Sequence, residues 1–274
     1  MSRKKLKKKN FVPRQVEPRF SAPTADRHDL YQISVQDSKT TIDLIDNVIK
    51  TRRDGTALKL REDFCGTALL CADWVCSYPA RTAVGVDIDR STLDWGAKHN
   101  IETLDNDAAR VELIEKDVKE SSGSDFDVIA ALNFSYSEFH DRTQLVAYLK
   151  TARAVLCDDG FLLLDLHGGP DAQFMLEAPR DMGDFEYVWE QESFDPINNR
   201  TVCHIHFHFH DGTRMERAFS YDWRLWSLPE LRDAMVDAGF AKVETWWDDQ
   251  DDVIRPLKST VNTEAWIAYL VGWK

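Results

Sequence analysis

Short, almost wholly apolar segments alternate with amphipathic segments through the first part of this chain. The apolar segments are residues 57–63, 82–88, 111–115, 126–132 and 161–166. Strands that are apolar along their whole length are buried on both faces, and strands that alternate with helices form a parallel sheet covered on both sides. The helical segments are residues 40–53, 67–76, 91–100 and 143–156, where apolar residues recur at helical spacing. The pattern predicts a doubly wound α/β fold.

The end of the chain adds one helix and two more strands to this sheet. Ser227-Leu228-Pro229-Glu230 is a capping-box sequence, and Gly239 is a typical helix stop. Residues 241–247 and 265–271 are apolar enough for strands. We therefore predict a Rossmann-like, mostly parallel sheet of seven strands.

Residues 171–223 break the alternation and predict an antiparallel β insertion after the fifth strand. Its expected strands are residues 187–193, 201–210 and 214–223, and Asp211-Gly212 is a strong hairpin signal. Four histidines alternate with apolar residues in the second of these strands and would share one face: His204, His206, His208 and His210. Histidines on one face can chelate a metal, but no carboxylate or cysteine has matching spacing. We expect a polar face backed by aromatic residues, and no metal site.

The turn after the first strand has the character of a nucleotide-holding corner. Against the spacing Glu-x-Gly-x-Gly-x-Gly, Glu62 fits the acid and Gly66 the middle glycine, whereas Phe64 and Ala68 occupy the outer glycine positions. Asp87 ends the second strand about twenty residues further on, where dinucleotide-binding folds place a carboxylate for the ribose hydroxyls.

Several polar residues fall at the expected carboxyl ends of the parallel strands, the edge where such sheets bind ligands. They are Glu62, Asp87, Asp117, Asn133 and His167. The sequence therefore predicts one ligand site at this edge of the sheet.

Charge and cysteine content limit the function and its location. A net charge of −13 argues against bulk electrostatic binding to nucleic acid or to an anionic membrane. The exception is the basic run at residues 3–9. This run belongs to a leader, residues 1–24, that we expect to be disordered. The five cysteines form no C-x-x-C pair, and no apolar run is long enough for a membrane span. We expect a cytoplasmic protein, and the sequence leaves a homodimer open.

The motifs together resemble those of the class I S-adenosylmethionine-dependent methyltransferases. The resemblance covers roughly Tyr31 to the C-terminus of the domain 25–274, and rests on the 62–70 turn, Gly85-Val86-Asp87-Ile88-Asp89, Lys116-Asp117-Val118 and residues 156–164. It implies S-adenosylmethionine as cofactor. The implied cofactor residues are Tyr31, Glu62, Asp63, Phe64, Cys65, Gly66, Asp87, Ile88, Asp117, Val118 and Asn133.

Within this resemblance, Glu62 and Gly66 lie beside the methionine part, and Asp63 is an alternative to Glu62. Asp87 binds the ribose hydroxyls, and Asp117 and Val118 flank the adenine. Tyr31, Ser34 and Gln36 belong to a leader that closes over the cofactor.

Methyl transfer is an in-line displacement, so the protein mainly positions the acceptor and removes its proton where needed. The candidates for this role are Tyr136, His140 and His167, at the ends of strands four and five. A cap of aromatic strands predicts an enclosed site for a small-molecule acceptor.

Three other functions stay open. The basic run at residues 3–9 would suit an RNA or protein methyltransferase, and the missing glycines would suit a non-catalytic cofactor-binding protein. A nicotinamide-dependent oxidoreductase is disfavoured because the turn lacks Gly-x-Gly-x-x-Gly.

Overall fold

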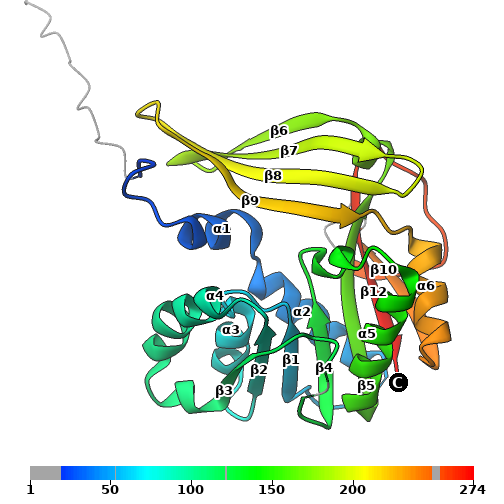
Figure 1. Ribbon diagram of the computed structural model, residues 1–274. Helices are drawn as coiled ribbons and strands as arrows, with labels where there is room; N and C mark the ends of the chain where they lie inside the picture. Colours follow the sequence, from blue (N-terminus) through cyan, green and yellow to red (C-terminus); the bar gives the residue numbers. More distant parts are fainter. Residues whose placement is uncertain (1–19, 53, 121, 249–253) are drawn as a thin grey trace, which may run out of the picture.

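Two layers make up the molecule: an α/β body and a curved antiparallel sheet above it (Figure 1). The computed structural model describes residues 20–52, 54–120, 122–248 and 254–274. The predicted basic run at residues 3–9 and most of the predicted leader lie outside these residues.

The body contains an eight-stranded sheet in the order β11-β10-β12-β5-β4-β1-β2-β3. Strands β1 to β5 pair in parallel with one another, and β12 is antiparallel to both β5 and β10. The strands are β1 (Lys59–Asp63), β2 (Thr82–Asp87), β3 (Val111–Glu115), β4 (Phe126–Ala131), β5 (Leu156–Gly168), β10 (Lys242–Asp248), β11 (Ile254–Leu257) and β12 (Trp266–Trp273). The predicted doubly wound, mostly parallel sheet is confirmed.

The strand count is eight and not the predicted seven, because β11 pairs with β10 at the sheet edge. This strand has only four residues and contains Pro256, which cannot donate a ladder hydrogen bond. Its sequence therefore carries little strand signal.

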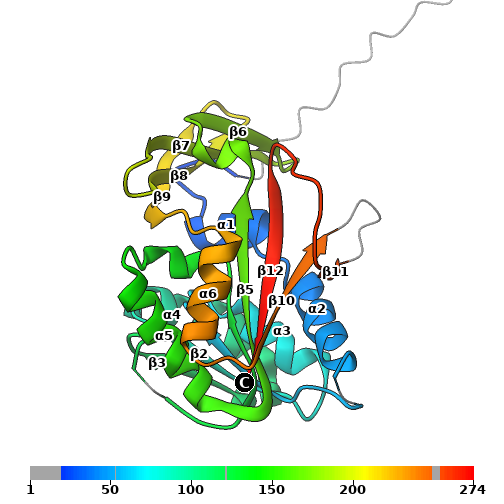
Figure 2. The ribbon, with the colours of Figure 1, turned by 90° about the vertical axis from the view of Figure 1, so that its right-hand side faces the viewer.

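Helices cover both faces of the sheet (Figure 2). One face packs against α2 (Ser38–Lys50), α3 (Leu69–Ser77) and α4 (Arg90–Gly96), and the other against α5 (Arg142–Val155) and α6 (Leu228–Asp237). The capping box at Ser227 is present, with Glu230 N donating to Ser227 Oγ and Ser227 N donating to the Glu230 carboxylate. Short π or 3-10 helices are η1 (Ala97–Ile101), η2 (Glu102–Arg110), η3 (Ser135–Glu138) and η4 (Pro170–Gln173).

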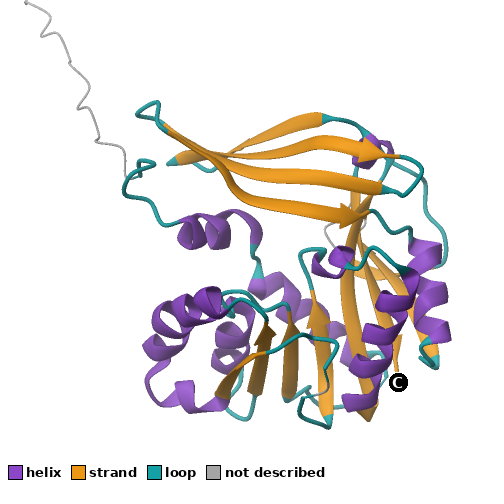
Figure 3. Ribbon diagram, in the orientation of Figure 1, coloured by secondary structure: helices purple, strands orange, loops and turns teal. Residues whose placement is uncertain are grey.

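The upper layer is a four-stranded antiparallel sheet in the order β6-β7-β8-β9 (Figure 3). Its strands are β6 (Leu176–Asp181), β7 (Phe185–Asp195), β8 (Arg200–Phe209) and β9 (Arg214–Arg224). The inner face packs on Leu30 of α1 (Arg27–Val35) through a small apolar core. The predicted insertion and its three strands are confirmed, whereas β6 and α1 were not predicted.

The chain reverses its strand order at β1, whose neighbours are β2 on one side and β4 on the other. Glu62, near the end of β1, is level with Gly85 of β2 and Ala130 of β4. A ligand crevice lies outside the strand ends at such a switch point. Here the antiparallel sheet lies over those ends (Figure 1).

Candidate functional site

A cavity of about 710 Å³ lies between the carboxyl ends of the parallel strands and the inner face of the antiparallel sheet. Glu62, Asn133 and Asp165 line it from the body, and Tyr187, Trp189, Tyr221 and Trp223 line it from the upper sheet. Residues from α1 to the start of α2 close one side, including Tyr31, Ser34, Gln36 and Asp37. The cavity thus joins the predicted switch-point residues to the insertion.

The turn from β1 into α3 keeps a glycine-like path without the outer glycines. Phe64, Gly66 and Ala68 have φ angles of 58°, 51° and 55°, all in the left-handed region. Only glycine enters this region without steric cost, and other residues pay about 1–2 kcal/mol. Phe64 and Ala68, which stand where the motif has glycine, therefore add strain to this turn. The turn nevertheless keeps three residues in the left-handed region.

Asp87 lies directly against this turn. Its Oδ2 accepts a hydrogen bond from Gly66 N at 2.8 Å, and its Oδ1 accepts one from Asp89 N at 2.9 Å. The side chain of Ile88, next in the chain, is 71% exposed. The structure therefore brings the predicted Gly66 and Asp87 together, but Gly66, Asp87 and Ile88 are absent from the described lining of the cavity, and their contact with a cofactor stays a prediction.

Asp117 and Val118 follow the end of the neighbouring strand β3. Asp117 Oδ1 accepts from Lys119 N at 2.9 Å, and Val118 is buried. Both residues are absent from the part of the cavity wall that the structure describes. Their predicted place beside an adenine stays a prediction.

Glu62 reaches the cavity wall from β1 as a buried carboxylate. Its Oε2 accepts hydrogen bonds from Cys71 N at 3.2 Å and Cys71 Sγ at 3.1 Å. Burial raises the pKa of Glu62 to about 8. A cationic group in the cavity would favour its charged form.

Asp63 has a different environment from Glu62. Its two carboxylate oxygens accept from Arg61 Nε at 2.6 Å and from the Tyr148 hydroxyl at 3.0 Å, and all three side chains are buried. The Arg61 guanidinium also donates to the carbonyl of Val118 at 3.3 Å. This network connects β1 to the segment after β3, which favours a structural role for Asp63; of these two acids, Glu62 is the one in the described lining of the cavity.

Phe64 and Cys65 also have packing partners. The ring of Phe64 meets Phe139 and Tyr148 with centroid distances of 5.9 Å each, and Cys65 is buried against Gly85. Their predicted contact with the cofactor stays a prediction.

Asp165 of β5 is a cavity residue that the sequence analysis missed. Its carboxylate accepts from Asn133 N at 2.9 Å and Phe134 N at 3.0 Å, and its carbonyl accepts from the Tyr136 hydroxyl at 2.7 Å. Asn133 and Phe134 are consecutive left-handed residues, with φ angles of 56° and 60°. Asp165 therefore holds the strained turn after β4, and burial raises its pKa to about 7. The one available signal was an acid inside an otherwise apolar strand.

The three candidates for handling the acceptor lie in different places. His167 lines the cavity, its ring lies 4.6 Å from that of Phe134, and burial lowers its pKa to about 4. Tyr136 is buried behind the turn, and His140 Nε2 contacts the carbonyl of Asp222 at 2.7 Å on an outer surface. Of the three, His167 alone belongs to the described lining of the cavity.

The predicted leader residues Tyr31, Ser34 and Gln36 do line the cavity. Tyr31 packs on Phe219 with a ring distance of 4.9 Å, and burial raises its pKa above the ordinary value. The carbonyl of Ser34 accepts from Arg180 of β6. α1 is thereby attached to the antiparallel sheet on one side of the cavity.

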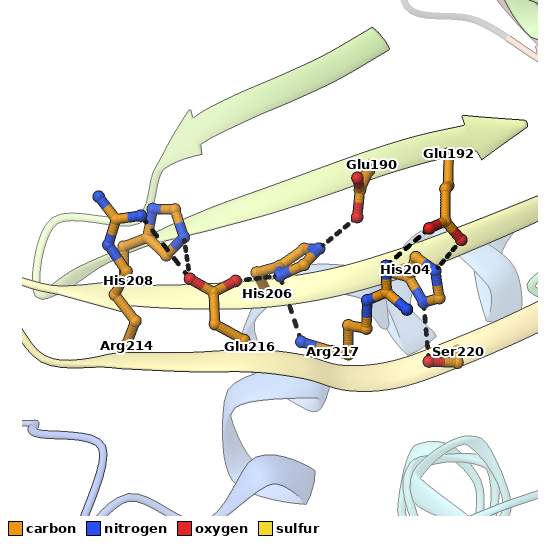
Figure 4. Close-up of polar contacts among 9 residues, drawn as sticks. All are labelled: Glu190, Glu192, His204, His206, His208, Arg214, Glu216, Arg217 and Ser220. Atoms are coloured by element: carbon orange, nitrogen blue, oxygen red, sulfur yellow. Dashed lines mark hydrogen bonds and ion pairs between the residues drawn. The ribbon is translucent and has the colours of Figure 1, made fainter. Parts of the chain in front are cut away.

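The outer face of β8 carries His204, His206 and His208 in a row (Figure 4). His206 lies between Glu190 of β7 at 2.9 Å and Glu216 of β9 at 2.5 Å. The carboxylates beside the other two are Glu192 at 3.0 Å from His204 and Glu186 at 3.3 Å from His208. Within the described part of the chain, no group of three or more histidine, cysteine, aspartate or glutamate side chains is arranged to hold a metal ion.

Two details of this face differ from the prediction. His210 lies beyond the end of β8, where its Nε2 contacts the Gly183 carbonyl at 2.9 Å. His204 and His206 are only 4% and 8% exposed, because the neighbouring strands' side chains cover them. His204 and His206 are therefore buried polar contacts between strands, whereas His208 is partly exposed.

No family model and no curated protein matches the sequence. Solved structures do match the fold. An S-adenosylmethionine-dependent methyltransferase from Clostridium acetobutylicum has a TM-score of 0.67 at 17% identity, with 89% of this chain and 96% of that chain covered. DesVI from Streptomyces venezuelae has a TM-score of 0.65 at 15% identity, with 90% and 98% covered. The chain has the class I methyltransferase fold.

A third structure with this fold is CalS10, an amino pentose methyltransferase from Micromonospora echinaspora, solved with S-adenosylmethionine bound. Its TM-score is 0.61 at 15% identity, with 89% of this chain and 95% of that chain covered. Among the described residues of the present chain, no helix is long and apolar enough to cross a membrane.

Proposed function

We propose that this chain is an S-adenosylmethionine-dependent methyltransferase that acts on a small molecule. The observation that carries the proposal is the cavity at the switch point. It has Glu62 and Asn133 on the body side and is covered by aromatic residues of the antiparallel sheet. Such enclosed sites suit small ligands, whereas a polymer needs an open groove.

The residues at the strand ends fit the cofactor. The buried carboxylate of Glu62 would hold the cationic amino group of the methionine part, and Asp87 would accept from the ribose hydroxyls. Ile88 offers an exposed apolar side chain to a base, and Asp117 and Val118 would flank the adenine. Bound here, the sulfonium group supplies an electrophilic methyl carbon.

The remaining cavity wall would position the acceptor. His167 offers a neutral imidazole near physiological pH, because its pKa is lowered by burial. Structures with the same fold include enzymes described as acting on sugars, such as the sugar N-methyltransferase KedS8 from Streptoalloteichus, with a TM-score of 0.60 at 15% identity. This supports a small polar acceptor, and the antiparallel sheet that lines the cavity would be the substrate lid.

Calorimetry with S-adenosylhomocysteine and with NADH tests the cofactor. We expect binding of S-adenosylhomocysteine and none of NADH; the reverse result would refute the proposal. Transfer of a labelled methyl group to small molecules of a cell extract tests catalysis. Cofactor binding without any labelled product would instead support a non-catalytic binding protein, and label in RNA or protein would support a polymer substrate.

Two further expectations accompany this function. None of the five cysteines, which all lie in the described residues, forms a disulfide bond, and this suits the reducing cytoplasm. A homodimer is the second, and sedimentation of the purified chain would test it.

A further inference from the structure

Two buried carboxylic acids line the cavity from different strands of the central sheet. The acids of the described lining are Asp37, Glu62, Asp165 and Asp171. Asp37 is exposed and Asp171 is partly exposed, so water weakens the electrostatic effect of both. Glu62 and Asp165 are only 6% and 8% exposed. These two acids therefore act on a ligand through surroundings of low dielectric constant, where the effect of a charge extends further.

The strand order separates Asp165 from the acid that would hold the methionine part of the cofactor. Glu62 belongs to β1 and Asp165 to β5, and β4 lies between these strands, so the two positions are about 10 Å apart across the sheet. Asp87, the predicted ribose residue, ends β2 on the other side of β1. The cavity continues from β1 past β4 to β5 and β12. The acceptor, and with it the transferable methyl group, would therefore lie on the Asp165 side of the cofactor.

Backbone hydrogen bonds hold the carboxylate of Asp165 without neutralising it. The carboxylate accepts from Asn133 N at 2.9 Å and from Phe134 N at 3.0 Å. Both donors are uncharged amides, so the ionised form keeps its full negative charge. Burial raises the pKa of Asp165 to about 7, and the residue is mostly ionised at pH 8.

The basic residues of the described lining leave this charge uncompensated. Arg180 is the one lysine or arginine among them, and its guanidinium lies 4.9 Å from the Tyr187 ring centroid and donates to the Ser34 carbonyl. His167 is the one histidine, and it is neutral at pH 8 because burial lowers its pKa to about 4. The described wall is therefore negative on the side of the strand ends.

Aromatic rings of the upper sheet cover the cavity from the opposite side. Tyr221 and Trp223 stack with centroids 4.3 Å apart, and Trp189 lies 5.9 Å from Trp223. The faces of such rings carry negative partial charge and attract cations. A positive charge between the strand ends and these rings would therefore be favoured from both sides.

We propose that Asp165 is a specificity-determining residue that makes the protein bind S-adenosylmethionine, with its positively charged sulfur, more tightly than S-adenosylhomocysteine, whose sulfur is neutral. This inference rests on the proposed function and deepens it. The two compounds differ by one methyl group and one charge, whereas Glu62 and Asp87 would contact parts that both share. At about 10 Å and an effective dielectric constant of about 20, one carboxylate favours one positive charge by a factor of about ten.

This preference would assist release of the used cofactor. During transfer the acceptor forms a bond to the methyl carbon, and the electron pair of the broken carbon–sulfur bond stays on sulfur. The positive charge thereby passes from sulfur to the acceptor. Asp165 then no longer favours the bound cofactor, so S-adenosylhomocysteine should be a weak product inhibitor.

Calorimetry of the full chain at pH 8 tests the preference. The ligands are S-adenosylmethionine, S-adenosylhomocysteine and sinefungin, an unreactive analogue with an ammonium group in place of the methyl sulfonium group. We expect the two cationic ligands to bind about tenfold more tightly than S-adenosylhomocysteine. A preference of less than about threefold for either of them would overturn the inference. Failure of all three ligands to bind would instead overturn the proposed function.

Two matched variants of β5 test the residue. Asp165→Asn removes the charge and keeps one oxygen that can accept from the backbone, so it should weaken S-adenosylmethionine about tenfold and S-adenosylhomocysteine less than about threefold. Asp159→Asn is the control, because Asp159 is exposed and lies six residues earlier in the strand, about 20 Å away. It should leave the ratio of the two affinities unchanged.

The variants also separate a charge effect from a structural one. Equal losses for both ligands in Asp165→Asn, or an unchanged ratio, would mean that Asp165 only supports the turn after β4, and would overturn the assignment. A changed ratio in Asp159→Asn of the same size would do so as well. Urea unfolding shows whether Asp165→Asn is folded, and if it is not, the comparison of the three ligands in the natural chain still decides the preference.

Discussion

Single side chains at the strand ends of this protein serve both the fold and the predicted ligand. Asp87 accepts hydrogen bonds from Gly66 N at 2.8 Å and Asp89 N at 2.9 Å, and it is also the residue predicted to bind the ribose hydroxyls. Asp89 caps α4 through Ser91 N and Thr92 N, and hydrogen bonds from these two residues' side chains hold its pKa at about 2. Asp87 and Asp89 are two residues apart in the chain but have different roles: Asp87 holds the Gly66 turn, and Asp89 caps α4.

Asp87→Ala should therefore weaken S-adenosylhomocysteine binding by about 2 kcal/mol, because it removes charge-assisted hydrogen bonds and frees the Gly66 turn. Calorimetry measures this change. Asp89→Ala is the control: it should lower stability by about 1 kcal/mol through loss of the cap and leave the affinity unchanged. An unaltered dissociation constant in Asp87→Ala would remove the ribose role.

Tyr136 and His167 differ in what their side chains can reach. The Tyr136 hydroxyl donates to the buried carbonyl of Asp165, so Tyr136→Phe should cost about 1 kcal/mol of unfolding free energy and change the methyl-transfer rate only a few-fold. His167→Phe, which removes a ring nitrogen of the cavity wall, should change the rate far more than the stability. Urea unfolding and initial rates measure the two effects. A large rate loss in Tyr136→Phe at unchanged stability would make Tyr136 the group that handles the acceptor.

At the scale of elements, α4 packs so closely on the β1–α3 turn that no side chain fits between them. A Cβ on Gly96 would come within 2.3 Å of the Thr67 carbonyl oxygen, and Asn100 Nδ2 donates to that same oxygen at 2.8 Å. Gly66 is different: a Cβ there would meet only Thr92 Cγ2 at 3.9 Å, but its φ is left-handed.

Gly96→Ala should therefore lower the unfolding free energy by roughly 2–3 kcal/mol, because backbone must move. Gly66→Ala should cost only about 1 kcal/mol, the balance between left-handed strain and the lower entropy of the unfolded chain. Urea denaturation of both variants measures this difference. Equal losses would mean that α4 is not held against the turn as closely as the structure has it.

The histidine row links three strands of the upper sheet through side chains. His206 bridges Glu190 of β7 and Glu216 of β9, so His206→Ala should cost about 1–2 kcal/mol. His210 is exposed and contacts the exposed turn carbonyl of Gly183, so His210→Ala should cost less than about 0.5 kcal/mol. Thermal unfolding at pH 7 compares them, and a loss in His210→Ala as large as in His206→Ala would argue against a bridging role.

The elements that sequence predicts correctly are those whose apolar pattern is set by the core. The parallel strands are buried on both faces, and the Ser227 capping box is a local signal. α1 has one fully buried apolar side chain, Leu30, and β6 is mostly exposed and contains Pro179, so neither shows a clear period. Tertiary contacts order them, and no local pattern encodes these contacts: α1 packs on the upper sheet, and β6 pairs with β7.

The same distinction applies to the site. Glu62, Asp87 and Asn133 follow from strand ends, which are readable from local sequence. Asp165 was missed because its role depends on two left-handed residues in the turn after another strand, 32 and 31 residues earlier in the chain. That Tyr136 points behind the turn while His167 enters the cavity likewise depends on tertiary packing.

At the scale of the whole molecule, buried ionisable groups should make stability fall as the pH rises. Burial raises the pKa of Glu62 to about 8 and that of Asp165 to about 7. The folded chain binds these protons more tightly than the unfolded chain, so their stabilising effect is complete near pH 4 and is lost as the pH rises through 7 and 8. His167 has the opposite effect on stability, because burial lowers its pKa from the ordinary 6.5 to about 4. Below pH 6.5 the unfolded chain binds this proton more tightly, so the contribution of His167 to stability rises with pH up to that value.

Two acids outweigh one histidine, so the unfolding free energy should fall by about 1 kcal/mol per pH unit between pH 5 and 8. Urea titrations at each pH measure this slope. The net charge of −13 adds repulsion in the same direction, but salt screens that part and leaves the effect of burial. The double variant Glu62→Gln/Asp165→Asn keeps His167 but lacks the two buried acids. At high salt its unfolding free energy should therefore rise, and not fall, with increasing pH below pH 6.5. A double variant with the slope of the natural chain would show that long-range charge, and not burial at the cavity, controls the pH dependence.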